Sequence, residues 1–177
     1  MRTADCKLRN GDTLVEDKHV SNPKSGRVLV VGIGNEMSGD DAAGLMLVNK
    51  LNASHEILTL DVGTVPESFI GKMIGAEAEM ILLVDAVDFG AAPGSVGLFG
   101  IGQITNFWCT THRVPLRLFM EYLRQETSSE MLLLGIQPKS MGFNAAPSAE
   151  VEASVSALAE LMNKHFFSVI EDLRVGG

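Results

Sequence analysis

Hydrophobic residues occur along most of the chain in short continuous runs that alternate with longer segments of three-to-four spacing. The short runs predict strands buried on both faces of a sheet, and the longer segments predict helices with one apolar face. Alternation of the two is typical of a parallel sheet covered by helices. The predicted strands are residues 27–33, 57–61, 80–84, 95–99 and 131–136, and the predicted helices include residues 41–51, 69–74, 114–125 and a last one from about 149.

The pattern starts at residue 27 and predicts one domain. Residues 1–25 are polar, mixed in charge and unlike a signal peptide, so we expect a flexible N-terminal arm. Residues 26–177 suffice for a single α/β domain, a twisted and mainly parallel sheet sandwiched between helices. The run MILLV at residues 80–84 is the most hydrophobic strand, which favours the centre of the sheet. Residues 64–67 have the spacing of a capping box for the helix that follows.

Charge and cysteine content narrow the class of protein. The chain has 14 Lys and Arg against 22 Asp and Glu, a net charge of −8, which argues against nucleic acid as a partner. Its two cysteines, Cys6 and Cys109, argue against a disulfide framework, so we expect a cytoplasmic protein. No apolar run is long enough to cross a bilayer, and we expect no membrane insertion.

Acidic side chains gather where the predicted strands end. The carboxyl ends of parallel strands meet at one edge of a sheet, and ligands bind in the crevice beyond it. His112 stands in a loop just before a predicted helix and could join these acids. The polar residues after the first three strands are Asn35, Glu36, Asp40 and Asp41, then Asp61, then Asp85 and Asp88.

Two such carboxylates and one imidazole would make a three-ligand site for a divalent ion such as zinc or nickel, and the same groups could activate water. Structural explanations also exist. Asp40 or Asp41 could cap the next helix and complement its dipole. Asp85 could accept hydrogen bonds in a turn, and His112 could be an ordinary loop histidine. Cys109 is near enough to His112 to suggest a Cys-His nucleophile pair, although a small buried thiol is the commoner case.

A dinucleotide-binding unit is a further alternative. Gly32 and Gly34 follow a strand and precede a helix, and Asp61 ends the second strand. The next glycine, Gly39, comes five residues after Gly34, so the glycine spacing is wrong for this motif. Acids at residues 40 and 41 would also place negative charge where a pyrophosphate should bind.

Residues 32–44, GIGNEMSGDDAAG, resemble the signature of the hydrogenase maturation endopeptidases, in which G-x-G-N, four residues and an acidic pair follow the first strand. Four further segments agree in order, and the resemblance as a whole runs from about residue 27 to residue 166. The segments at residues 110–116 and 134–138 resemble most closely the branch that serves formate-hydrogenlyase-type hydrogenases. The segments are LDVGT at 60–64 with Glu67, LVDA at 83–86 followed by Pro93 and Gly94, TTHRVPL at 110–116, and LGIQP at 134–138.

The resemblance implies a metal-dependent endopeptidase. It would remove a C-terminal extension from a nickel-iron hydrogenase large-subunit precursor after nickel insertion, without a serine or cysteine nucleophile. The metal-binding and catalytic positions of the family fall on Asp41, Asp85 and His112, and Asp61 matches a position that helps to recognise substrate. The nickel would come with the precursor, and zinc or cadmium could replace it in vitro. A nickel-responsive binding module without hydrolysis remains a second hypothesis.

Two geometric expectations follow for this site. The carboxylates of Asp41 and Asp85 and the imidazole of His112 should converge at the carboxyl edge of the sheet. With a metal bound, their donor atoms should lie roughly 3–4 Å apart. We also expect these residues to be exposed in a cleft, so that replacing Asp85 or His112 would hardly change stability.

Overall fold

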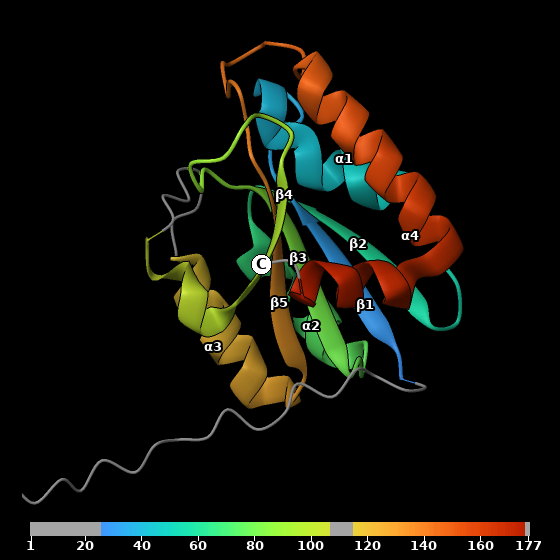
Figure 1. The fold of residues 1–177 in the computed structure, drawn as a ribbon. Coiled ribbons are helices and arrows are strands. Elements are labelled where there is room, and N and C mark those ends of the chain that lie inside the picture. The colour runs from blue at the N-terminus through green and yellow to red at the C-terminus, as the bar shows by residue number, and fades with distance from the viewer. Residues whose placement is uncertain (1–25, 107–114, 176–177) are drawn as a thin grey trace, which may run out of the picture.

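The computed structural model describes residues 26–106 and 115–175, which contain one five-stranded sheet with helices on both faces (Figure 1). The strand order is β2-β1-β3-β5-β4, and all neighbours are parallel except β4, which runs antiparallel to β5. The sequence prediction of a mainly parallel sheet with residues 80–84 at its centre is therefore confirmed. The strands are β1 (Val28–Ile33), β2 (Ile57–Gly63), β3 (Met80–Ala86), β4 (Val96–Gly100) and β5 (Glu130–Ile136).

The helices divide between the two faces of the sheet (Figure 1). Helices α1 and α4 share one hydrophobic core with the sheet, whereas α2 and α3 share the other. In the part of the chain that the structure describes, three short 3-10 helices lie in the connections. The helices are η1 (Gly39–Ala42), α1 (Ala43–Lys50), η2 (Pro66–Phe69), α2 (Ile70–Gly75), η3 (Ile101–Asn106), α3 (Leu116–Thr127) and α4 (Ala149–Val175).

Both faces of the sheet are buried, which explains why its strands are continuous hydrophobic runs. Successive side chains of a strand point to opposite faces. Val30 of β1 accordingly packs in the core under α1 and α4, while Val31 packs in the core under α2 and α3. The whole of β3 is buried because it has a strand on each side and helices above and below.

Two glycines let α1 lie close to the sheet at its carboxyl edge. A Cβ atom on Gly44 would clash with the carbonyl oxygens of Ile33 and Val84, and one on Gly32 would clash with the carbonyl oxygen of Gly44. Only a glycine leaves room for this approach. The start of α1 is therefore fixed over the ends of β1 and β3, where the acidic residues lie.

Some local expectations differ from the structure. The predicted capping box is wrong, because η2 begins at Pro66 after Val65 and has no side-chain cap hydrogen bond. The predicted arm at residues 1–25 lies outside the described residues. Among the helices that the structure describes, none is both long and apolar enough to span a bilayer.

Candidate active site

Asp41 is held at the carboxyl edge of the sheet by a tight turn between β1 and α1. Its backbone N–H donates to the carbonyl of Ser38, and its own carbonyl accepts from the N–H of Asn35, both at 3.2 Å. Gly34 makes this turn possible, because it adopts a φ of +142° and any Cβ there would clash with the Asp41 carbonyl. The residue is buried, with an exposed fraction of 1%.

Asp85 comes to the same edge from β3, where its exposed fraction is also 1%. Its Oδ1 accepts a hydrogen bond from the backbone N–H of Ala86 at 2.9 Å. The short helix η1, which carries Asp41, lies against β3. The expectation that these acids would be exposed in a cleft is therefore wrong, because both are covered by the elements that meet at this edge.

Carboxylate oxygens are ligands that divalent cations accept, and buried carboxylates in proteins are paired, hydrogen-bonded or bound to metal. Within the part of the chain that the structure describes, no three His, Cys, Asp or Glu side chains form a group that could hold a metal. His112 and Cys109 lie outside the described residues. The convergence of Asp41, Asp85 and His112 therefore stays a prediction.

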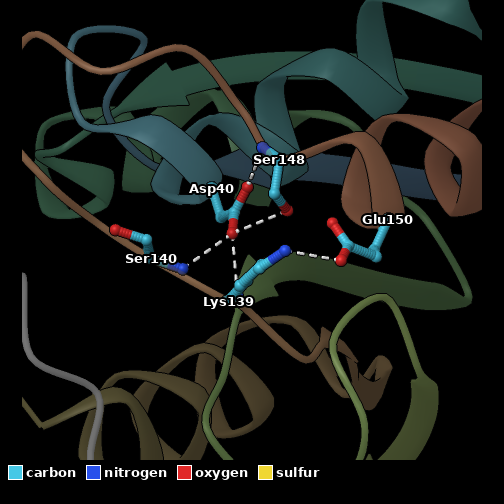
Figure 2. A network of polar contacts seen from close by, with 5 residues as sticks. All are labelled: Asp40, Lys139, Ser140, Ser148 and Glu150. Carbon is cyan, nitrogen blue, oxygen red and sulfur yellow. Dashed lines mark hydrogen bonds and ion pairs between the residues drawn. The ribbon is translucent and has the colours of Figure 1, made fainter.

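Asp40, the other member of the acidic pair, has a different set of contacts (Figure 2). Its Oδ2 accepts from the backbone N–H groups of Lys139 at 2.7 Å and Ser140 at 2.9 Å, and from the Ser148 hydroxyl at 3.0 Å. Its Oδ1 accepts from the Ser148 N–H at 2.6 Å.

The capping explanation for the acidic pair is wrong, because neither η1 nor α1 has a side-chain cap hydrogen bond.

These donors decide the ionisation state of Asp40. Burial by itself raises the pKa of this carboxyl, but the N–H groups of Ser148, Ser140 and Lys139 and the Ser148 hydroxyl outweigh it and bring the pKa below its usual value. The group is therefore a carboxylate whose two oxygens already accept four hydrogen bonds. Such a group is poorly suited to bind a metal or take up a proton.

Asp61 lies on the neighbouring strand and faces open space. In the register of the sheet it is level with Gly32 of β1, and its Oδ1 accepts from the N–H of Gly63 at 3.0 Å. It is exposed and lines a hollow of about 450 Å³ in front of the turn that carries Asp41. The hollow is lined by Gly34, Asn35, Glu36, Met37, Leu45, Asp61, Gly63 and Thr64.

Gln137 organises the loop after β3, a role that the sequence pattern does not predict. Its Oε1 accepts from the N–H groups of Phe89 at 2.9 Å and Ala91 at 3.2 Å, and its Nε2 donates to Asp88 Oδ1 at 3.0 Å. The Gln137 amide, with the N–H of Gly90, lowers the pKa of Asp88. The available signal was a single amide residue directly after the buried run of β5.

The geometry does not favour the dinucleotide alternative. Gly39 comes five residues after Gly34 and begins η1, which carries the buried carboxylates of Asp40 and Asp41. These negative charges lie just before the N-terminus of α1, which in a dinucleotide-binding unit receives the pyrophosphate. Negative charge at this position would repel the ligand.

Comparison with known proteins gives a consistent family. Residues 45–165 match the family model described as hydrogenase maturation protease. The hydrogenase 3 maturation protease of Escherichia coli K12 is 35% identical over 114 residues, which cover 63% of this chain and 72% of that protein.

Solved structures give the same result for the fold. The NiFe hydrogenase maturation protease HycI of Thermococcus kodakarensis KOD1 superposes with a TM-score of 0.73 at 31% identity, over 80% of this chain and 94% of the other. The hydrogenase maturating endopeptidase HybD of Escherichia coli superposes with a TM-score of 0.64 at 25% identity, over 85% and 94%.

Proposed function

The chain belongs to the hydrogenase maturation protease family, and we propose that it removes the C-terminal extension of a nickel-iron hydrogenase large-subunit precursor once nickel has been inserted. As a member of this family it is a hydrolase that acts on hydrogenase precursors. The reaction would take place in the cytoplasm, in keeping with a chain that has only two cysteines. The observation that carries the proposal is the pair of buried carboxylates, Asp41 and Asp85, at the carboxyl edge of the sheet.

We assign metal binding to Asp41, Asp85 and His112. Carboxylate and imidazole ligands suit a divalent ion such as nickel, and zinc or cadmium would be accepted in vitro. When bound, such an ion would polarise a carbonyl group or lower the pKa of a water molecule. The nickel ion is bound to the precursor, and the enzyme recognises it as part of its substrate.

Residues around this edge have separate roles in the proposal. The hollow beside Asp61 receives the segment of precursor next to the bond that is cut, because it opens directly in front of the Asp41 turn. Asp61 is an exposed carboxylate at its rim and would contact the substrate. Asp40 takes no part in proton transfer, because four donors already occupy its oxygens.

The proposal is tested by incubating the purified protein with a nickel-loaded large-subunit precursor. Intact-mass measurement should show the loss of one C-terminal peptide from the precursor. A native gel on the same mixture reports binding. A precursor that is bound but keeps its full mass would favour the alternative of a nickel-responsive binding module, and would exclude the protease assignment for this chain.

A further inference from the structure

The connection from β5 to α4 contains a long loop, residues 139–148, which we call the strap. It has no helix or strand of its own, apart from an isolated bridge between Ser38 and Ala145. Both ends of the strap are bound to one carboxylate, since Asp40 accepts from Lys139 and Ser140 at the start and from Ser148 at the end (Figure 2). Asp40 thus closes the loop as a clamp.

The closed strap lies along the turn that carries the acidic pair. The N–H of Asn144 donates to the carbonyl of Met37 at 2.5 Å, and the N–H of Gly39 donates to the carbonyl of Ala145 at 3.2 Å. The backbone N–H of Asp40 also donates to the carbonyl of Ser140 at 3.0 Å. The turn at residues 35–39 is therefore supported from outside by the strap.

This turn forms one wall of the hollow beside Asp61, because Asn35, Glu36 and Met37 all line it. The wall is hydrogen-bonded to the strap, and both ends of the strap are hydrogen-bonded to the Asp40 carboxylate. Asp41 is hydrogen-bonded to the same turn, at Asn35 and Ser38, but it has a second support in the close packing of α1 on the sheet. Loss of the Asp40 carboxylate should therefore disturb the wall more than it disturbs the position of Asp41.

We propose that Asp40 is a positioning residue for substrate binding, which clamps the strap and so holds the 35–37 wall of the hollow in the shape that receives the precursor. The inference rests on the proposed function, because the occupant of the hollow is the precursor. It assigns to Asp40 no contact with the reacting atoms. Loss of the clamp should weaken binding and leave the chemical step largely intact.

The test is steady-state cleavage of nickel-loaded precursor by Asp40→Asn. The amide matches the carboxylate in size, but both carboxylate oxygens receive backbone N–H groups, so either orientation sets an NH₂ group against a donor. We expect KM to rise at least about tenfold while kcat changes less than about threefold. Hydrogen exchange at the Gly39 and Asn144 amides should accelerate, since these report the contact between turn and strap.

Two further variants control the experiment. Glu150→Gln breaks the exposed ion pair with Lys139 Nζ, 2.6 Å long, but leaves the clamp untouched, and it should keep the wild-type KM. Ser148→Ala removes one of the four hydrogen bonds and should raise KM about threefold. This milder variant carries the test if Asp40→Asn does not fold.

The outcomes separate this inference from the proposed function. An unchanged KM in a variant whose strap amides exchange faster would overturn the role of Asp40 and leave the protease assignment intact. A fall in kcat alone would also overturn it, because it would mean that Asp40 acts on the chemical step, either directly or through Asp41. If the wild-type protein binds precursor without cutting it, the proposed function fails. A higher dissociation constant for Asp40→Asn would then still support the clamp. Lack of any precursor binding by the wild type would overturn both.

Discussion

Asp85 is a buried acid whose substitution can separate function from folding. Asp85→Asn keeps the shape of the side chain and an oxygen to accept from the Ala86 N–H, but it removes the negative charge. If Asp85 is a metal ligand, we expect cleavage of the precursor to fall at least about a hundredfold, since even outer contacts of metal sites contribute 10- to 100-fold. The free energy of unfolding should change by less than about 1 kcal/mol. Urea denaturation and the cleavage assay measure the two effects.

Asp85→Ala provides the comparison. It removes the acceptor for the Ala86 N–H in a buried place, so we expect a loss of about 1–3 kcal/mol in addition to the loss of activity. Equal destabilisation by Asn and Ala would show that the charge itself holds the fold together. In that case Asp85 would be a structural acid, and its assignment as a metal ligand would be withdrawn.

The adjacent acids Asp40 and Asp41 mark the limit of prediction from sequence. The sequence places both at the carboxyl edge, and this is confirmed by the structure. The local pattern of residues cannot separate their roles, because the partners of Asp40 lie about 100 residues further along the chain, at Lys139, Ser140 and Ser148. The local pattern suggested a helix cap, whereas the long-range contacts make Asp40 a clamp.

At the scale of elements, the close packing of α1 on the sheet depends on Gly44. Gly44→Ala would place a Cβ against the carbonyl oxygens of Ile33 and Val84, backbone atoms that cannot move aside cheaply. We expect a loss of about 3 kcal/mol or more in unfolding free energy, at the upper end of the usual cost of overpacking. Activity should fall as well, because the same helix fixes the end of the turn that holds Asp41.

Gly71→Ala in α2 is the matched control for this substitution. A Cβ there meets no atom within 4 Å, and alanine forms helix better than glycine, so stability should rise by about 0.5–1 kcal/mol. Chemical denaturation of both variants measures the difference. A neutral Gly44→Ala would mean that α1 can shift away from the sheet without cost.

The contact between β5 and the last turn of α4 predicts a dependence of stability on pH. Burial raises the pKa of Glu130, and the Arg174 guanidinium, 2.7 Å away, lowers it only in part. A raised folded pKa gives stability that is complete below the unfolded value, near 4.5, and is lost as pH rises through the folded pKa. Glu130→Gln removes this titration. We therefore expect the difference in unfolding free energy, Glu130→Gln minus wild type, to increase between pH 4.5 and pH 7. Urea denaturation of both proteins at the two pH values measures this difference. A flat or opposite trend would contradict the prediction.

The elements were more predictable than their ends. Buried strands are short runs of apolar residues, a local signal, and β3 was identified by its sequence MILLV. The start of η2 was missed because Thr64 and Glu67 have capping-box spacing, but Pro66 fixes the backbone so that the turn begins one residue later, after Val65. The composition of an apolar run predicts that it is buried. The residue at which a helix begins depends on backbone geometry, which the spacing of two polar residues does not determine.

For the whole molecule, the order of events in maturation follows from the small number of ligands. Asp41, Asp85 and His112 are three proposed ligands from separate segments, and such an open set should hold a divalent ion more weakly than a closed four-ligand site. Weak binding has a consequence for fidelity. An enzyme that retained its own nickel would cut precursors whose active site was still empty, whereas one that relies on the nickel of the precursor would cut only loaded precursors.

We therefore expect chelator-treated enzyme to cleave nickel-loaded precursor and to leave nickel-free precursor intact. Intact-mass analysis of the two precursors side by side measures the difference, and added zinc tests whether another ion restores cutting of the empty form. Zinc that restored cutting would fit a site whose ligands accept several divalent ions, since geometry and availability rather than raw affinity decide which metal is bound. Equal cleavage of both precursors by the chelated enzyme would contradict the idea that this site reads the metal of its substrate.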